Sequence, residues 1–247
     1  MEIKSAKKGE NNLTISEMVT EDYRRAEVFK KFGFDFCCGG KKTLNEACSE
    51  KGVNITDVAE ALKVLDNQER HVSHDYDKWE LDTLVDHIVE THHKYVNEAL
   101  PLLDEFSTKV AKVHGNVHTE VVAISQYYQA IANELRMHMH KEEFILFPYI
   151  RQMAATKRNN EQLPPPAFGT IKNPIQMMET EHDSAGSTME MIKNLSNNYT
   201  PPENACNTYR VLYAKLKEFE EYLHKHIHLE NNILFPKAIR MEDEFLA

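Results

Sequence analysis

The segment His138-Met-His-Lys-Glu-Glu-Phe-Ile-Leu-Phe-Pro148 returns 88 residues later as His226-Ile-His-Leu-Glu-Asn-Asn-Ile-Leu-Phe-Pro236, with seven of the eleven positions identical. Each copy places a histidine and a glutamate four residues apart. These pairs are His138 with Glu142 and His226 with Glu230. Residues four apart lie one above the other on the same face of a helix. The repeat therefore indicates two similar helices that each present a His–Glu pair.

Both pairs fall on the apolar stripe of their helix. The stripes read Ile124, Tyr128, Ile131, Leu135, His138, Glu142, Ile145 in the first copy and Leu212, Leu216, Phe219, Leu223, His226, Glu230, Ile233 in the second. A buried carboxylate without compensation costs several kcal/mol, or its pKa shifts until the group is neutral. The pattern therefore favours a bound cation over the alternative, which is a buried His–Glu ion pair in each helix.

Two further histidines extend the repeat. His93 lies 45 residues before His138, and His182 lies 44 residues before His226. Neighbouring His92 fits an equally apolar stripe, and the symmetry of the spacing favours His93. Two helical hairpins related by a pseudo-two-fold axis make an antiparallel four-helix bundle, which brings the four histidines and two glutamates to one level. Six ligands of this kind suit a pair of metal ions that the carboxylates bridge.

The ligand types narrow the choice of metal. Imidazole suits zinc, iron and copper, whereas shared carboxylates in a bundle core favour iron or manganese. Ferritin-like di-iron proteins instead use Glu-x-x-His, and this chain also contains Glu90-Thr-His-His93 and Glu179-Thr-Glu-His182. A ferritin-like di-iron oxidase is therefore an alternative. It ranks lower because Glu179 lies off the apolar stripe of its helix.

Composition indicates an all-α protein inside the cell. Only 8 Gly and 9 Pro among 247 residues leave room for long helices, and the formal net charge of −10 argues against nucleic acid or an anionic membrane as a partner. The chain has no run of about 18 apolar residues, and its amino terminus is polar rather than a signal peptide. Four cysteines, two of them adjacent, do not make a disulfide framework and point to a reducing compartment.

The chain divides into three predicted parts. Residues 1–66 form a small helical domain, 67–77 a charged linker without periodicity, and 78–247 the bundle. Thr43-Leu-Asn-Glu46 predicts a capping box at the start of a helix in the first domain. Pro164-Pro165-Pro166 predicts a loop from about residue 155 to 173, because prolines stop helices. This loop separates the two halves of the repeat.

The other histidines and two of the cysteines are predicted to lie outside the metal site. The histidines expected on solvated faces of the bundle are His140, His224 and His228. His114 shares a stripe with His93, but 21 residues of straight helix put it about 32 Å away. His71 and His74 belong to the linker, and Cys48 and Cys206 are expected to be structural.

Several motifs in combination carry a family resemblance. They are Cys37-Cys38-Gly39-Gly40-Lys-Lys-Thr-Leu, Lys112-Val-His-Gly115, the stretch from Glu134 to Pro148, Pro174-Ile-Gln-Met-Met-Glu-Thr-Glu-His182-Asp, Ala205-Cys206, and the stretch from His226 to Pro236. From about residue 12 to its end, the chain resembles the iron–sulfur cluster repair di-iron proteins, also called the repair of iron centres family. The resemblance implies a hemerythrin-like four-helix bundle with a carboxylate-bridged centre of two non-haem iron ions, preceded by a small helical domain.

The resemblance also implies a function and a set of ligands. The function is cytoplasmic repair of iron–sulfur proteins damaged by nitric oxide or oxygen species; a homodimer is left open. The family's ligand positions fall on His93, His138, His182 and His226, with Glu142 and Glu230 as bridges, which is the set that the stripes and spacing give. Relatives are expected to have other residues at positions 92, 140 and 228.

A mechanism follows as a hypothesis. A site of imidazoles and carboxylates without thiolates should hold iron less tenaciously than a thiolate cage, so it could give iron to a damaged cluster, react with nitric oxide, or do both. Cys37 and Cys38 lie in a glycine-rich turn whose exposed backbone amides could stabilise a thiolate, which makes them candidate catalytic carriers of iron or a nitrosyl group. The alternative for this turn is an ordinary helix connection. A hemerythrin-like binder of oxygen or nitric oxide stays open, as does the question of enzymatic or stoichiometric action.

Overall fold

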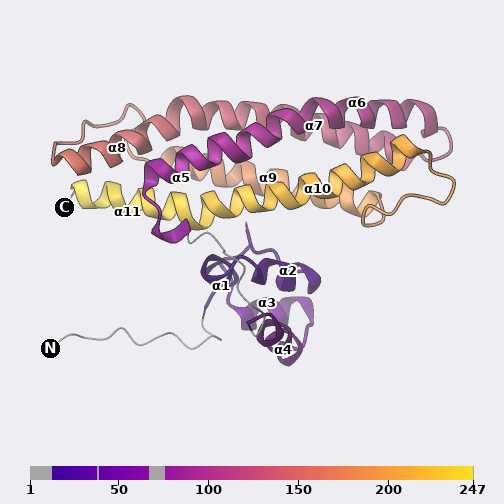
Figure 1. Ribbon diagram of the computed structural model, residues 1–247, viewed down its shortest axis with the longest axis horizontal. Coiled ribbons are helices and arrows are strands. Elements are labelled where there is room, and N and C mark those ends of the chain that lie inside the picture. Colours follow the sequence, from indigo (N-terminus) through magenta and orange to yellow (C-terminus); the bar gives the residue numbers. More distant parts are fainter. Residues whose placement is uncertain (1–12, 38, 67–75, 247) are drawn as a thin grey trace. The chain divides into compact units, whose positions relative to one another are not determined.

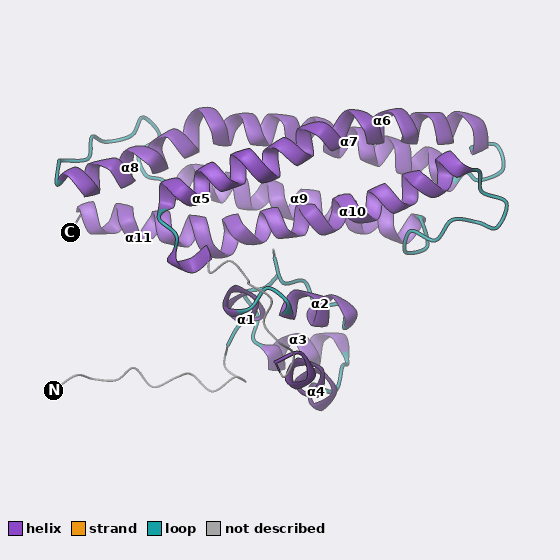
Figure 2. Ribbon diagram, viewed as in Figure 1, coloured by secondary structure: helices purple, strands orange, loops and turns teal. Residues whose placement is uncertain are grey.

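The computed structural model describes residues 13–37, 39–66 and 76–246. The regular elements of these ranges are helices, which confirms the all-α prediction (Figure 2). The chain divides into two compact units: residues 1–79 with the segment 228–233, and residues 80–227 with 234–247. Most of the predicted linker, including His71 and His74, lies outside the described residues. Its last residues, Tyr76 and Asp77, begin the short helix Tyr76–Lys78.

Four short helices make up the amino-terminal part of the first unit: α1 (Ile15–Glu21), α2 (Arg25–Lys31), α3 (Leu44–Lys51) and α4 (Ile55–Asp66). The predicted capping box at Thr43 and Glu46 is present, and Thr14 with Glu17 forms a second one at the start of α1. An isolated antiparallel bridge joins Thr14 to Thr43. Since each capping box satisfies two backbone donors at a helix start, the bridge holds two capped starts together.

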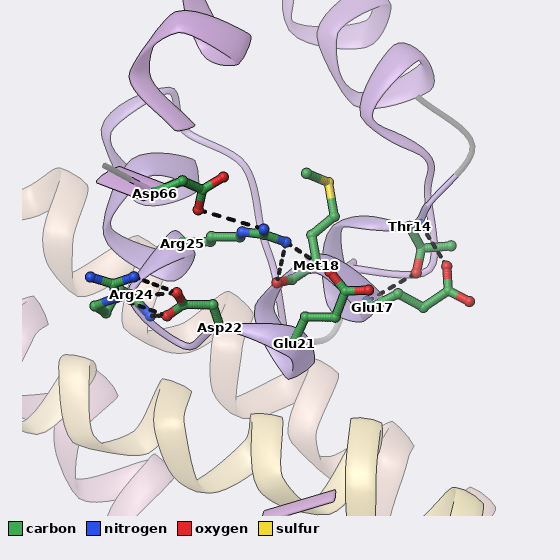
Figure 3. A network of polar contacts seen from close by, with 8 residues as sticks. All are labelled: Thr14, Glu17, Met18, Glu21, Asp22, Arg24, Arg25 and Asp66. Atoms are coloured by element: carbon green, nitrogen blue, oxygen red, sulfur yellow. Dashed lines mark hydrogen bonds and ion pairs between the residues drawn. The ribbon is translucent and has the colours of Figure 1, made fainter. Parts of the chain in front are cut away.

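Arg25 ties three parts of this helical group together (Figure 3). Its guanidinium donates to the backbone oxygen of Met18 and to the carboxylate of Glu21, at 3.3 and 2.9 Å, and lies 3.6 Å from the carboxylate of Asp66 at the end of α4. Beside it, Arg24 donates to both carboxylate oxygens of Asp22, which lowers the pKa of Asp22. Charged groups thus fasten the end of α1 to the start of α2.

Four long helical rods form the bundle (Figure 1). The first rod joins α5 (Leu81–His87) to α6 (Lys94–His114), and the second joins α7 (Glu120–Lys141) to α8 (Phe147–Asn159). The third rod is α9 (Lys172–Leu195), and the fourth joins α10 (Asn207–Leu229) to α11 (Phe235–Leu246). Packing of α6 on α7, of α7 on α9, and of α5 and α11 on α8 makes the antiparallel bundle that the repeat predicts.

Three of these rods contain a π-helical segment that the sequence did not predict. The segments are Ile88–His93, Glu142–Leu146 and Glu230–Leu234. A π turn is wider than an α turn and changes which residues face inward from that point. The stripe through Glu142 was therefore wrong at Ile145, which is 50% exposed, and its neighbour Leu146 is buried instead. The chain remains helical through Pro148 and Pro236, which lie two residues after the ends of two of the wide segments.

The central connection is shorter than predicted. Helix α8 continues to Asn159, so placing the loop from residue 155 was wrong by one helical turn. The helix ends where Asn160 adopts the left-handed conformation, with φ of 55°, four residues before the first proline of the run. Among the described residues, no helix is both long and apolar enough to cross a membrane.

Candidate metal centre

The six side chains that the stripes and spacing single out lie together inside the bundle. One potential ligand atom from each of His93, Glu142, His226 and Glu230 lies within 4.8 Å of the others, and the same holds for a second group. The second group is His138, Glu142, His182 and Glu230. Each of the six side chains is at most 2% exposed. The two groups share both glutamates, which is the arrangement that two carboxylate-bridged metal ions require.

Glu142 is the geometric centre of the arrangement. Its Oε2 lies 3.3 Å from Nε2 of His93 and 3.3 Å from Nε2 of His138. In the second group, Nε2 of His138 and Nε2 of His182 lie 3.0 Å apart. These ring nitrogens lie close to one another and to the shared carboxylate of Glu142. The donor atoms therefore converge on common points. Neutral imidazoles and carboxylates are ligands that suit iron, so this donor set fits the expected metal.

The π segments supply several of these ligands. His93 ends the first segment, and Glu142 and Glu230 begin the other two. His138 and His226 lie one turn earlier, in α7 and α10. Segments of this kind are frequent at functional sites because the wider turn redirects side chains and frees backbone groups from the regular ladder. In this bundle they occur in three rods at the level of the buried site.

The phenylalanines of the repeat pack against histidines of the site. Phe147 stacks on the ring of His93, with centroids 5.6 Å apart and an interplanar angle of 22°. Its counterpart Phe235 lies 6.1 Å from His182 at an angle of 3°. Each Leu-Phe-Pro segment thus places a buried ring that restrains one imidazole of the site. The sequence showed that these residues repeat but did not reveal this role.

Two carboxylates outside the six were missed by the sequence analysis. Nδ1 of His93 lies 2.6 Å from Oε1 of Glu143, and Nδ1 of His138 lies 2.9 Å from Oε2 of Glu181. Lys141 also donates to Glu181. The hydrogen bond with His138 and the Lys141 ammonium lower the pKa of Glu181 to about 2. A carboxylate on the far nitrogen orients a ligating imidazole and raises its basicity, so both are suited to support metal ligands.

The residues of the ferritin-like alternative lie elsewhere. Among the described residues, neither Glu90 nor Glu179 belongs to a group that could hold a metal ion, and Glu90 is exposed. His92 is fully buried, and its ring stacks 5.4 Å from that of His226, but it too is outside both groups. The structure therefore favours His93 over His92 and gives no support to a Glu-x-x-His site.

Of the three histidines expected on solvated faces, one was wrongly placed. His140 is exposed and His224 is half-buried, whereas His228 is 1% exposed. His228 lies in the segment 228–233, which is grouped with the first unit, and its Nδ1 is 3.0 Å from Nδ2 of Asn232. Burial lowers the pKa of His228 to about 4. The error arose because a position off the apolar stripe was assumed to face water.

His114 and Cys206 form a pair at a different place in the bundle. Nε2 of His114, at the end of α6, lies 3.2 Å from the thiol sulfur of Cys206, just before α10. The His114 ring also packs 5.4 Å from that of Tyr209. Cys206, which was expected to be structural, has an exposed side chain. Cys48 is buried, and burial raises the pKa of its thiol.

The predicted glycine-rich turn places Cys37 in an unexpected environment. The Cys37 side chain is buried, and its thiol and backbone N–H donate to Oδ1 of Asp35 at 3.2 and 2.9 Å. The backbone amide of Cys37, which was expected to be exposed and able to stabilise a thiolate, instead donates to the Asp35 carboxylate. Gly40 is required, because a Cβ would lie 2.5 Å from the carbonyl oxygen of Phe36. Cys38 lies outside the described residues.

Comparison with known proteins adds independent findings. Residues 84–238 match the Hemerythrin HHE cation binding domain, and residues 11–66 match the Domain of Unknown function (DUF542). The chain is 39% identical over 219 residues to the iron–sulfur cluster repair protein YtfE of Yersinia pseudotuberculosis serotype O:1b, covering 89% of this chain and 93% of the relative. The protein of the same name from Yersinia pestis shows the same identity and coverage.

Proposed function

Because the chain belongs to the iron–sulfur cluster repair family and has a hemerythrin HHE domain in its bundle, we propose that it is a di-iron protein that repairs iron–sulfur clusters. The clusters in question are those damaged by nitrosative or oxidative stress. One observation supports this proposal above all: two groups of four ligand side chains share the buried carboxylates of Glu142 and Glu230. Four imidazoles and two carboxylates are the donor set of a non-haem di-iron centre.

The residues of the site have separate tasks in this proposal. His93 and His226 would hold one iron ion, His138 and His182 would hold the other, and Glu142 and Glu230 would contribute to both positions. Phe147 and Phe235 restrain imidazoles and exclude water. Bound iron would supply a redox-active Lewis acid that reacts with nitric oxide, and it would also be the cargo given to a damaged cluster. A site built without thiolates would release this cargo more readily than a thiolate cage.

The repair proposal can be tested directly on a damaged cluster. We expect the iron-loaded protein, under anaerobic conditions, to restore the visible absorption and activity of a dehydratase whose [4Fe–4S] cluster has been treated with nitric oxide. Glu142→Ala should abolish this recovery because it removes a ligand from both groups. Glu179→Ala is the matched control, because this glutamate is not in either group. Equal recovery with Glu142→Ala, or without the protein, would overturn the proposal.

A hemerythrin-like binder of oxygen or nitric oxide is the second candidate, since the matching domain covers residues 84–238 and not the amino-terminal part. The two candidates differ in whether they need Cys37 and Cys38, which we propose as carriers of iron or a nitrosyl group. If repair depends on these carriers, Cys37→Ser with Cys38→Ser should lose repair and keep the iron. A binder would keep its nitric oxide affinity in that variant and would show no repair even as the unaltered protein.

A further inference from the structure

The two proposed iron positions have the same ligand types but different surroundings. Each would use two imidazoles and the same two carboxylates. In each position, one histidine has a carboxylate hydrogen-bonded to its Nδ1: Glu143 for His93 and Glu181 for His138. Both of these carboxylates are 33% exposed, so solvent screens them to a similar degree. A difference between the positions can therefore come from what else contacts these two carboxylates.

Lys141 makes that difference. The Lys141 ammonium contacts the Glu181 carboxylate. The Lys141 side chain is 28% exposed, so this contact is partly shielded from water. A carboxylate shared between an ammonium and an imidazole is a weaker acceptor than one that serves the imidazole alone. Glu143 is therefore the stronger hydrogen-bond partner for the Nδ1 of His93, and Glu181 the weaker one for the Nδ1 of His138. Lys141 also adds a positive charge beside the second position, which opposes the binding of a cation there.

From these contacts we infer that the two iron positions are unequal, and that the ion held by His138 and His182 is the one given up first. The ion held by His93 and His226 stays in place as the retained partner. This inference rests on the proposed function, since it requires that two ions bind. It assigns to Glu143, Glu181 and Lys141 a positioning and charge-setting role rather than direct contact with the metal.

Release of iron to a chelator tests this inequality. The full chain is loaded anaerobically with two equivalents of Fe(II) and mixed with excess of a chromogenic phenanthroline-type chelator. We expect two phases of equal amplitude. Glu143→Gln should accelerate the slow phase about 10- to 100-fold, the usual effect of losing an outer carboxylate partner, and should leave the fast phase unchanged. Glu181→Gln should accelerate the fast phase alone.

A variant of Lys141 should give a result that a merely structural role of this residue would not predict. Lys141→Met should slow the fast phase severalfold, because the lost ammonium no longer weakens Glu181 or repels the ion. Damage to the fold would accelerate release rather than slow it. Lys141→Arg keeps the charge and should retain the original fast phase. Lys109→Met is the matched control, since Lys109 is exposed and 16 residues beyond His93, about 24 Å along the helix.

The outcomes separate the inference from the proposal on which it rests. If the chain binds two iron ions but releases them in a single phase, or if Glu143→Gln accelerates the fast phase, the inequality as assigned is wrong and the di-iron proposal stands. If the chain does not bind two iron ions, the proposed function itself fails. Faster release with Lys141→Met would also contradict the assignment.

Discussion

Glu142 is the residue on which the proposed centre most depends. Its carboxylate lies between His93 and His138 and belongs to both ligand groups. We therefore expect Glu142→Ala to reduce iron from two ions to fewer than one per chain, because both positions lose a ligand. Iron analysis after anaerobic purification measures this. Glu179→Ala should leave the iron content unchanged, and a loss in that variant would instead support a ferritin-like site.

Cys206 is expected to be the most reactive of the three cysteines that the structure describes. It is exposed, whereas Cys37 and Cys48 are buried, and the imidazole of His114 lies 3.2 Å from its sulfur. Since the thiolate is the nucleophile, an adjacent imidazole that accepts the proton should speed alkylation. Iodoacetamide labelling followed by mass spectrometry should show Cys206 labelled before Cys37 and Cys48, and more slowly in His114→Gln. Faster labelling of Cys37 or Cys48 than of Cys206, or an unchanged rate at Cys206 in His114→Gln, would contradict this expectation.

At the scale of single residues, the sequence singled out the six proposed ligands but not the residues that contact them. Histidines and glutamates on apolar stripes single out six side chains, and the structure brings those six together. Glu143, Glu181 and Lys141 could not be found this way, because their partners lie 40 to 50 residues away and no spacing rule links them. His228 was misplaced because the rings of Tyr23 and Phe36, far away in the sequence, pack against it, which a helical stripe does not reveal.

At the scale of elements, the π segments are what the sequence did not show. A prediction from a hydrophobic stripe assumes one constant helical period. A wide turn therefore appears only as a residue that is predicted to be buried and is exposed, as at Ile145. The one available signal was the proline that follows two of the segments, at positions 148 and 236. Capping was easier to predict, because the Thr-x-x-Glu pattern contains both side chains that form the capping hydrogen bonds.

One buried glutamate joins three elements of the bundle. Glu242 in α11 is 3% exposed and accepts hydrogen bonds from the Tyr149 hydroxyl of α8 and the Ile171 backbone N–H that precedes α9, at 3.1 and 2.9 Å. Glu242→Ala leaves these buried donors without their acceptor. We expect a loss of about 2–3 kcal/mol in the free energy of unfolding, measured with urea.

Glu244 provides the matched control for this prediction. It lies two residues later in α11, is 61% exposed and pairs with Lys157 on the surface. Glu244→Ala should change the free energy of unfolding by less than about 0.5 kcal/mol. Equal losses for the two alanine variants would show that the buried network has no special importance for stability.

At the scale of the whole molecule, the internal repeat determined most of what could be foreseen. Two copies of one motif, each preceded by a histidine helix, predicted two hairpins and hence the four-rod bundle. The small amino-terminal helices were harder to predict, because their stripes are short. The arrangement of the two units cannot be read from a periodic pattern, since that pattern describes one helix at a time.

Metal removal should weaken the bundle as a whole. The proposed ligands come from all four rods, so an ion that binds only the folded state would stabilise the association of the rods. We expect a chelator to lower the melting temperature of the iron-loaded chain by about 10 °C, as followed by circular dichroism. Glu142→Ala should melt at the same temperature with and without chelator. An unchanged melting temperature in the unaltered chain would contradict a metal bound between the rods.

The central claim is that two iron ions lie between the rods, bridged by Glu142 and Glu230. Mössbauer spectroscopy of anaerobically purified, ⁵⁷Fe-enriched protein, combined with iron quantification on the same sample, tests this claim most directly. We predict two iron ions per chain with the spin coupling of a carboxylate-bridged pair, and two distinguishable iron environments. A single uncoupled iron, another metal, or a chain that contains no iron would contradict the account.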